Sequence, residues 1–164
     1  MINYIFKIIE WLPRKIKRKQ NESIIHKFWL KQISETIYGV EFVGQELQDM
    51  YACLYFKGLK DGYFIDIGAY DGITISNTYA LEKIGWKGIC VEPVPEIYER
   101  LIKNRTCECI NAAIYNEDGK TLDFIQTKGG RSGFIGNMND RMIKAAESEG
   151  IVGKYKVKKK TLIV

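Results

Sequence analysis

The 164-residue sequence has a single histidine and no pair of cysteines at CxxC spacing. His26 has no second imidazole or cysteine at metal-ligand spacing, so we expect no metal site and interpret His26 as a surface residue. The four cysteines are Cys53, Cys90, Cys107 and Cys109. Their spacing favours free thiols in a reducing cytoplasm, and Cys90 lies in an apolar run that is typical of a buried strand.

The sequence also lacks a secretory signal and an N-terminal apolar run long enough to span a bilayer. Residues 2–12 are apolar, but their basic cluster follows them instead of preceding them, so we expect a cytoplasmic protein. One face of a helix can be lined here by Ile2, Ile5, Phe6, Ile9 and Leu12. Two interpretations stay open for this arm: it docks on the domain, or it contacts anionic lipid peripherally at the inner face of the membrane.

Acidic residues are missing from two basic runs, residues 14–19 and residues 154–160. These runs supply ten of the 25 basic residues, so the 20 acidic residues outnumber the basic ones in the rest of the chain. The net charge of +5 therefore belongs to the two ends. This distribution argues against a nucleic-acid partner bound across the fold.

Helical patterns come first, over residues 23–57, and a strand–helix alternation with short connections follows. Strands are predicted over residues 63–67, 87–92 and 107–115, and helices over residues 73–85 and 95–104. This order predicts parallel strands with right-handed crossovers, the first half of a doubly wound α/β sheet.

The C-terminal third shows weaker patterns. The letters "NEDG" predict a turn into a hairpin arm, "KTLDFIQ". A glycine-rich loop over residues 127–140, a short helix near residues 141–149 and a strand-like tail over residues 154–164 follow. We therefore divide the chain into an apolar and basic arm (1–22), N-terminal helices (23–60) and a partial cofactor-binding domain (61–164).

The turn after the first predicted strand, "GYFIDIGAYDGITISNT", has the shape of a nucleotide-binding loop but carries acids. Gly68 and Gly72 permit close approach of a ligand, whereas Tyr70 takes the place of the second glycine of a dinucleotide loop and would obstruct a pyrophosphate. Asp66 and Asp71 would repel a phosphate, but they suit an ammonium group and tolerate a sulfonium. These features indicate S-adenosylmethionine.

Glu92 ends the second predicted strand about two dozen residues after Gly68, where an acid can accept hydrogen bonds from both ribose hydroxyls. S-adenosylmethionine and NAD would both use this acid. An NAD-linked oxidoreductase therefore remains an alternative, as does a non-catalytic module that binds cofactor or only a partner protein.

Four segments together resemble the FkbM family of S-adenosylmethionine-dependent methyltransferases. They are "GQELQDMYA", "FIDIGAYDGITISNT", "GWKGICVEPVPEIYERL" and "INAAIYNEDG", within residues 43–126. The resemblance implies a seven-stranded, Rossmann-like class I methyltransferase fold. It also implies O-methylation of a sugar or glycan hydroxyl, or of a hydroxyl on a small natural product such as a polyketide.

The resemblance further implies a set of cofactor contacts. The methionine part would be surrounded by Asp66, Gly68, Tyr70 and Gly72, with its carboxylate near Ser76 and Asn77. The ribose would lie near Glu92, and the adenine near Asn111 and Ala112.

The sequence departs from the family after residues 161–162, where members continue into a helix and a strand with an acidic D-x-E-G motif. We therefore expect a truncated domain with an incomplete sheet. The first strand, residues 63–67, should have one side without a partner, because the lysine-rich tail makes a poor central strand. We expect no methyltransferase activity from the chain by itself and assign no catalytic base.

Overall fold

The structure is a computed structural model that describes residues 20–116, 119, 121–128 and 132–161, without the side chains of residues 20–27 and 137. Most of the expected arm and the side chain of His26 lie outside these residues. The chain forms two compact units that divide between Phe42 and Val43. In the described part, no helix has both the length and the apolar content needed to cross a membrane.

The first unit contains helix α2 (Gln20–Tyr38). The helix ends at Gly39, whose φ of 67° is the left-handed conformation common at helix C-termini. The N–H of Gly39 donates to the carbonyl of Glu35, and the Glu35 carboxylate accepts from the N–H of Phe42. These contacts end the helix well before residue 57, so the predicted helical region contains more than one helix, as expected.

The second helix, α3 (Gln48–Tyr55), opens the second unit. Asp49 in its first turn is fully buried. Its carboxylate accepts hydrogen bonds from the N–H groups of Val43, Gly44 and Met50. A buried acid thus fixes the segment that leads into α3.

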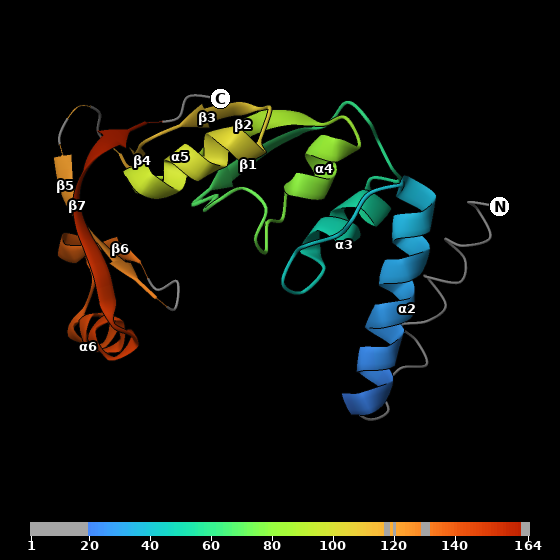
Figure 1. Ribbon diagram of the computed structural model, residues 1–164, viewed down its shortest axis with the longest axis horizontal. Coiled ribbons are helices and arrows are strands. Elements are labelled where there is room, and N and C mark those ends of the chain that lie inside the picture. Colours follow the sequence, from blue (N-terminus) through green and yellow to red (C-terminus); the bar gives the residue numbers. More distant parts are fainter. Residues whose placement is uncertain (1–19, 117–118, 120, 129–131, 162–164) are drawn as a thin grey trace. The chain divides into compact units, whose positions relative to one another are not determined.

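A three-stranded parallel sheet follows, in the order β1-β2-β3. Its strands are β1 (Tyr63–Ile67), β2 (Lys87–Val91) and β3 (Glu108–Ile110). The connecting helices α4 (Tyr79–Lys83) and α5 (Pro95–Asn104) lie on one side of this sheet (Figure 1). The predicted alternation of parallel strands and helices is confirmed.

Strand β1 lies at an edge of this sheet, because within the described residues it pairs only with β2. Phe64 points to the covered face and is buried, whereas Ile65 and Ile67 on the opposite face are 39% and 61% exposed. The alternation follows from the two-residue period of a strand.

Helix α4 is shorter than the helix predicted over residues 73–85. Asp71 accepts hydrogen bonds from two backbone N–H groups of the turn that follows it. The hydroxyl of Ser76 accepts from the N–H groups of Thr78 and Tyr79. These side chains take the place of helical carbonyl partners, so the helix begins only at Tyr79.

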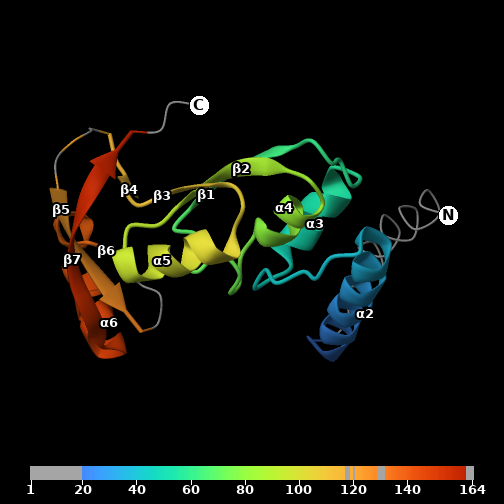
Figure 2. The same ribbon diagram turned by 45° about the horizontal axis from the view of Figure 1, so that its top comes forward.

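A second sheet has four strands in the order β4-β7-β5-β6. They are β4 (Ala113–Ile114), β5 (Thr121–Thr127), β6 (Gly133–Phe134) and β7 (Ile151–Lys160). Between β6 and β7 lie the short helix η1 (Ile135–Asn137) and α6 (Asp140–Glu149). Figure 2 shows β7 running along β5, and the predicted helix and tail strand are both present.

Two predictions about this region are wrong. The predicted hairpin arm is β5, and it does not pair with β4, the strand before it. Strand β7 lies between β4 and β5 and pairs with β5 from Thr121 to Thr127. The single strand predicted over residues 107–115 is divided between the two sheets. Asn111 lies at the break, where its side-chain amide donates to the carbonyls of Glu92 and Pro93.

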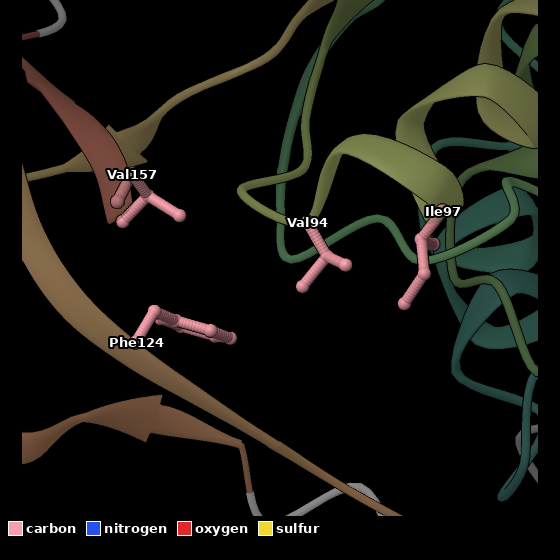
Figure 3. Close-up of a cluster of buried hydrophobic side chains, with 5 residues drawn as sticks. Val94, Ile97, Phe124 and Val157 are labelled. Atoms are coloured by element: carbon pink, nitrogen blue, oxygen red, sulfur yellow. The ribbon is translucent and has the colours of Figure 1, made fainter. Parts of the chain in front are cut away.

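A buried apolar cluster packs α5 against the second sheet (Figure 3). Its members are Val94, Ile97, Ala113, Phe124 and Val157. Burying each of the larger side chains contributes about 1.5–3 kcal/mol. The cluster therefore connects the helix that follows β2 to β5 and β7.

An ion pair between Arg105 and Glu82 joins the end of α5 to α4. The other Glu82 carboxylate oxygen accepts from the N–H and the hydroxyl of Thr106, at 2.7 and 2.6 Å. Burial alone would raise the pKa of Glu82, but the Thr106 hydrogen bonds and the Arg105 guanidinium lower it to about 2. The charged form of Glu82 thus stabilises the fold.

We predict that Glu82→Gln destabilises the protein by on the order of 3 kcal/mol at pH 7 in urea unfolding. Because folding lowers the pKa of Glu82, its charge contributes fully to the stability of the protein above the ordinary pKa of 4.5. This contribution is lost as the pH falls toward 2. The difference between variant and wild type should therefore shrink over that pH interval. Asp123→Asn is the matched control: its ion pair with Lys156 is exposed, so the change should cost less than about 1 kcal/mol. An equal effect of both changes would contradict the stabilising role of the Glu82 charge.

Candidate functional site

A cleft of about 760 Å³ lies at the carboxyl ends of β1 and β2. We call its two sides the loop wall and the strand wall. The loop wall consists of Asp66, Ile67, Gly68, Ala69, Tyr70, Thr74, Ile75, Ser76, Asn77, Glu92, Pro93, Val94 and Ile97. The strand wall consists of Phe124, Gln126, Thr127, Lys128, Ser132 and Val152. Ligands of open parallel sheets bind at this end of the strands.

Most of the predicted site residues lie in the loop wall. They are Asp66, Gly68, Tyr70, Ser76, Asn77 and Glu92. Gly72, Asn111 and Ala112 do not line the cleft. The carbonyl of Gly72 accepts from Arg105, the Asn111 side chain bonds backbone carbonyls, and Ala112 is buried.

Asp66 is half-buried at the end of β1. One of its carboxylate oxygens accepts a hydrogen bond of 2.6 Å from the hydroxyl of Thr78. The Thr78 oxygen accepts in turn from Arg105, at 3.1 Å. Thr78 thereby fixes the Asp66 carboxylate, and no other described residue is hydrogen-bonded to its second oxygen, which remains for a ligand.

Glu92 is buried at the end of β2, with 4% of its surface exposed. One carboxylate oxygen accepts from the N–H of Tyr70 and the other from the N–H of Val94, each at 3.0 Å. Burial raises the pKa of Glu92, while these hydrogen bonds and the charge of Arg100 oppose the rise. A carboxylate offers about four lone-pair sites, so Glu92 can still accept hydrogen bonds from ligand hydroxyls.

The backbone N–H groups of the turn after β1 are mostly used within the protein. Those of Gly68 and Ala69 both donate to the carbonyl of Val91, at 2.8 and 3.0 Å. Tyr70 donates to Glu92, and its φ of 52° places it in the left-handed region. The turn therefore does not form the nest of free N–H groups that binds a phosphate.

Asp71 does not line the cleft, which corrects its interpretation as a ligand-facing acid. One of its oxygens accepts from the N–H groups of Ile73 and Thr74, and the other accepts from the Thr74 hydroxyl. Burial raises the pKa of Asp71, but these hydrogen bonds outweigh burial and lower it. Asp71 stabilises the turn.

The strand wall was not predicted from the sequence. Gln126 and Lys128 come from β5 and the residue after it, and Ser132 from the residue before β6. These polar residues carry no recognisable motif, and the pairing of β5 with β7 was not expected. Only the fold brings them into the same cleft as Asp66 and Glu92. Among the described residues, no cluster of histidine, cysteine and acidic side chains could hold a metal ion.

The two glycines of the turn yield a matched prediction. At Gly68 (φ 78°) an added methyl group would meet open space, so Gly68→Ala should cost about 1–2 kcal/mol from backbone strain alone. At Gly72 (φ 81°) the methyl group would lie 2.6 Å from the side chain of Arg105 and 2.7 Å from that of Leu101. Gly72→Ala should therefore lower the stability measured by urea unfolding clearly more than Gly68→Ala does. An equal or smaller loss for Gly72→Ala would contradict this packing.

Comparison with known proteins identifies a family. The methyltransferase FkbM domain matches residues 66–162, more than half of the chain and both walls of the cleft. No curated protein and no solved structure gives a significant match. The chain therefore belongs to the FkbM methyltransferase family.

Proposed function

We propose that the chain binds S-adenosylmethionine in this cleft, as part of an O-methyltransferase that acts on a hydroxyl of a sugar, a glycan or a small natural product. The observation that carries the proposal is the pair of carboxylates, Asp66 and Glu92, at the ends of neighbouring parallel strands in one cleft. On this proposal the three-stranded sheet is the first half of a Rossmann-like class I methyltransferase sheet.

The residues of the loop wall fit the chemical groups of this cofactor. The free oxygen of Asp66 suits the ammonium group, and the Glu92 carboxylate suits the two ribose hydroxyls. Asn77 and Ser76 lie on the same wall and can donate to the cofactor carboxylate. When bound, S-adenosylmethionine supplies a methyl group on a positively charged sulfur, which two nearby carboxylates tolerate.

The same wall disfavours a dinucleotide and hence an NAD-linked oxidoreductase. A pyrophosphate is normally held by free backbone N–H groups after the first strand. Here those of Gly68, Ala69 and Tyr70 already have partners in the protein. Two carboxylates nearby would repel the phosphates as well.

Methyl transfer to a hydroxyl also requires that the acceptor lose its proton to a base. In the described lining of the cleft there is no histidine, and this proposal assigns the carboxylates of Asp66 and Glu92 to the cofactor. This observation supports a second candidate, a non-catalytic module that binds the cofactor without turnover.

We also propose that the protein works in the cytoplasm. All four cysteines are free, and the sulfurs of Cys90 and Cys107 lie 3.5 Å apart without a bond between them. Free cysteines are typical of a reducing compartment.

Calorimetric titration tests the proposed cofactor. We expect S-adenosylhomocysteine to bind and NAD not to bind. Glu92→Gln should weaken S-adenosylhomocysteine binding by about 1.5–3 kcal/mol, roughly ten- to a hundredfold, because it removes a charge-assisted contact with the ribose. Wild-type affinity should fall as the pH drops through the raised pKa of Glu92, and the variant should not show this dependence.

Glu99→Gln is the matched control, since Glu99 is an exposed acid of α5 outside the cleft. Circular dichroism checks that each variant keeps its fold, because Glu92 also holds the N–H groups of Tyr70 and Val94. Tight binding of NAD together with no binding of S-adenosylhomocysteine would overturn the proposal.

A further inference from the structure

We propose that the strand wall binds a carboxylate of the acceptor, so that the acceptor is a hydroxyl compound that is also an acid, such as an acidic sugar. This inference rests on the proposed function and names the substrate class of the same cleft.

Three polar side chains of the strand wall, those of Gln126, Ser132 and Lys128, have hydrogen-bond donors for a ligand. The side-chain oxygen of Gln126 accepts from the Tyr155 hydroxyl at 3.1 Å, which leaves the Gln126 amide N–H groups for a ligand. The Ser132 hydroxyl oxygen accepts from the N–H of Thr127 at 3.1 Å, which leaves its O–H to donate. The Lys128 ammonium has donors only.

Lys128 also supplies positive charge. It is the one cationic side chain among the described residues that line the cleft. No carboxylate of the described residues forms an ion pair with it. Its charge is therefore available to an anion that enters the cleft, and the amide and hydroxyl donors can complete the contact.

The two walls thus differ in chemistry. Asp66 and Glu92 on the loop wall are acceptors, whereas Gln126, Lys128 and Ser132 on the strand wall are donors. A single cation with two neutral donors suits a monoanion such as a carboxylate. If cofactor and acceptor bind together, the cationic cofactor would contact the loop wall and the carboxylate of the acceptor would contact the strand wall.

The cofactor carboxylate is the competing occupant of the strand wall. In S-adenosylmethionine this carboxylate and the ammonium group are bonded to the same carbon atom. With the ammonium at Asp66, the carboxylate stays on the loop wall, where Ser76 and Asn77 lie. This geometry leaves Lys128 to the acceptor.

Paired sugar probes test the inference. Methyl β-glucuronide and methyl β-glucoside differ chiefly in a carboxylate that replaces a hydroxymethyl group. Each is titrated into the full chain by calorimetry, with and without saturating S-adenosylhomocysteine, so that the strand wall is tested whether or not the cofactor binds. We expect the glucuronide to bind more tightly. Lys128→Met should weaken its binding roughly three- to tenfold and leave the glucoside unaffected.

Two further variants control for charge and fold. Lys128→Arg should keep most of the preference for the glucuronide, because the charge is retained. Lys154→Met should not change it, because Lys154 is an exposed lysine of β7 outside the cleft. Equal binding of both sugars, binding of neither, or an unchanged preference in Lys128→Met would overturn the inference.

A second arm distinguishes the two carboxylates. S-adenosylhomocysteine carries the amino-acid group, and 5′-methylthioadenosine lacks it. If Lys128→Met weakens binding of the first but not of the second, the strand wall holds the cofactor carboxylate and the inference is wrong. We expect the variant to bind both nucleosides as the wild type does. Failure of both to bind even the wild type would instead contradict the proposed function.

Discussion

The buried guanidinium of Arg105 holds together the segment between β1 and α4, and the cleft depends on that segment. It pairs with Glu82, donates to the carbonyl of Gly72 at 3.1 Å and donates to the Thr78 hydroxyl at 3.1 Å. Because Thr78 donates to Asp66, one side chain separates this buried charge from the carboxylate that faces the cleft. Removing either member of such a buried pair leaves an uncompensated charge, which typically costs 3–5 kcal/mol. The position of Asp66 is thus fixed by a contact from beyond the end of α5.

Glu92 explains how a turn shaped like a nucleotide-binding loop can carry acids. It binds the N–H of Tyr70, while the carbonyl of Val91 binds those of Gly68 and Ala69. The turn therefore has few donors left for a phosphate, and the cleft presents carboxylates on this side instead. This arrangement supports the proposed binding of a cationic ligand with hydroxyl groups. The donors of the strand wall complement this polarity, which supports the acidic acceptor proposed above.

Local signals in the sequence were sufficient for the first sheet and for most of the loop wall. Short apolar runs that stop at Gly68 and Pro93 predict β1 and β2, and the acids at the ends of these strands, Asp66 and Glu92, do line one cleft. The second sheet was not predictable in this way. Strand β4 has only two residues and β7 has ten, so β5 forms more hydrogen bonds with β7 than it could with β4. This pairing joins segments far apart in the sequence, and local patterns do not reveal it. The strand wall depends on that pairing, and the role of Arg105 depends on contacts across more than 20 residues of sequence.

A crystal structure of the protein with S-adenosylhomocysteine tests the central claim most directly. We expect the ammonium group within hydrogen-bond distance of Asp66 and both ribose hydroxyls at the carboxylate of Glu92. A ligand bound outside the cleft, or one with its carboxylate against Asp66 and its ribose away from Glu92, would contradict the roles assigned to these two acids.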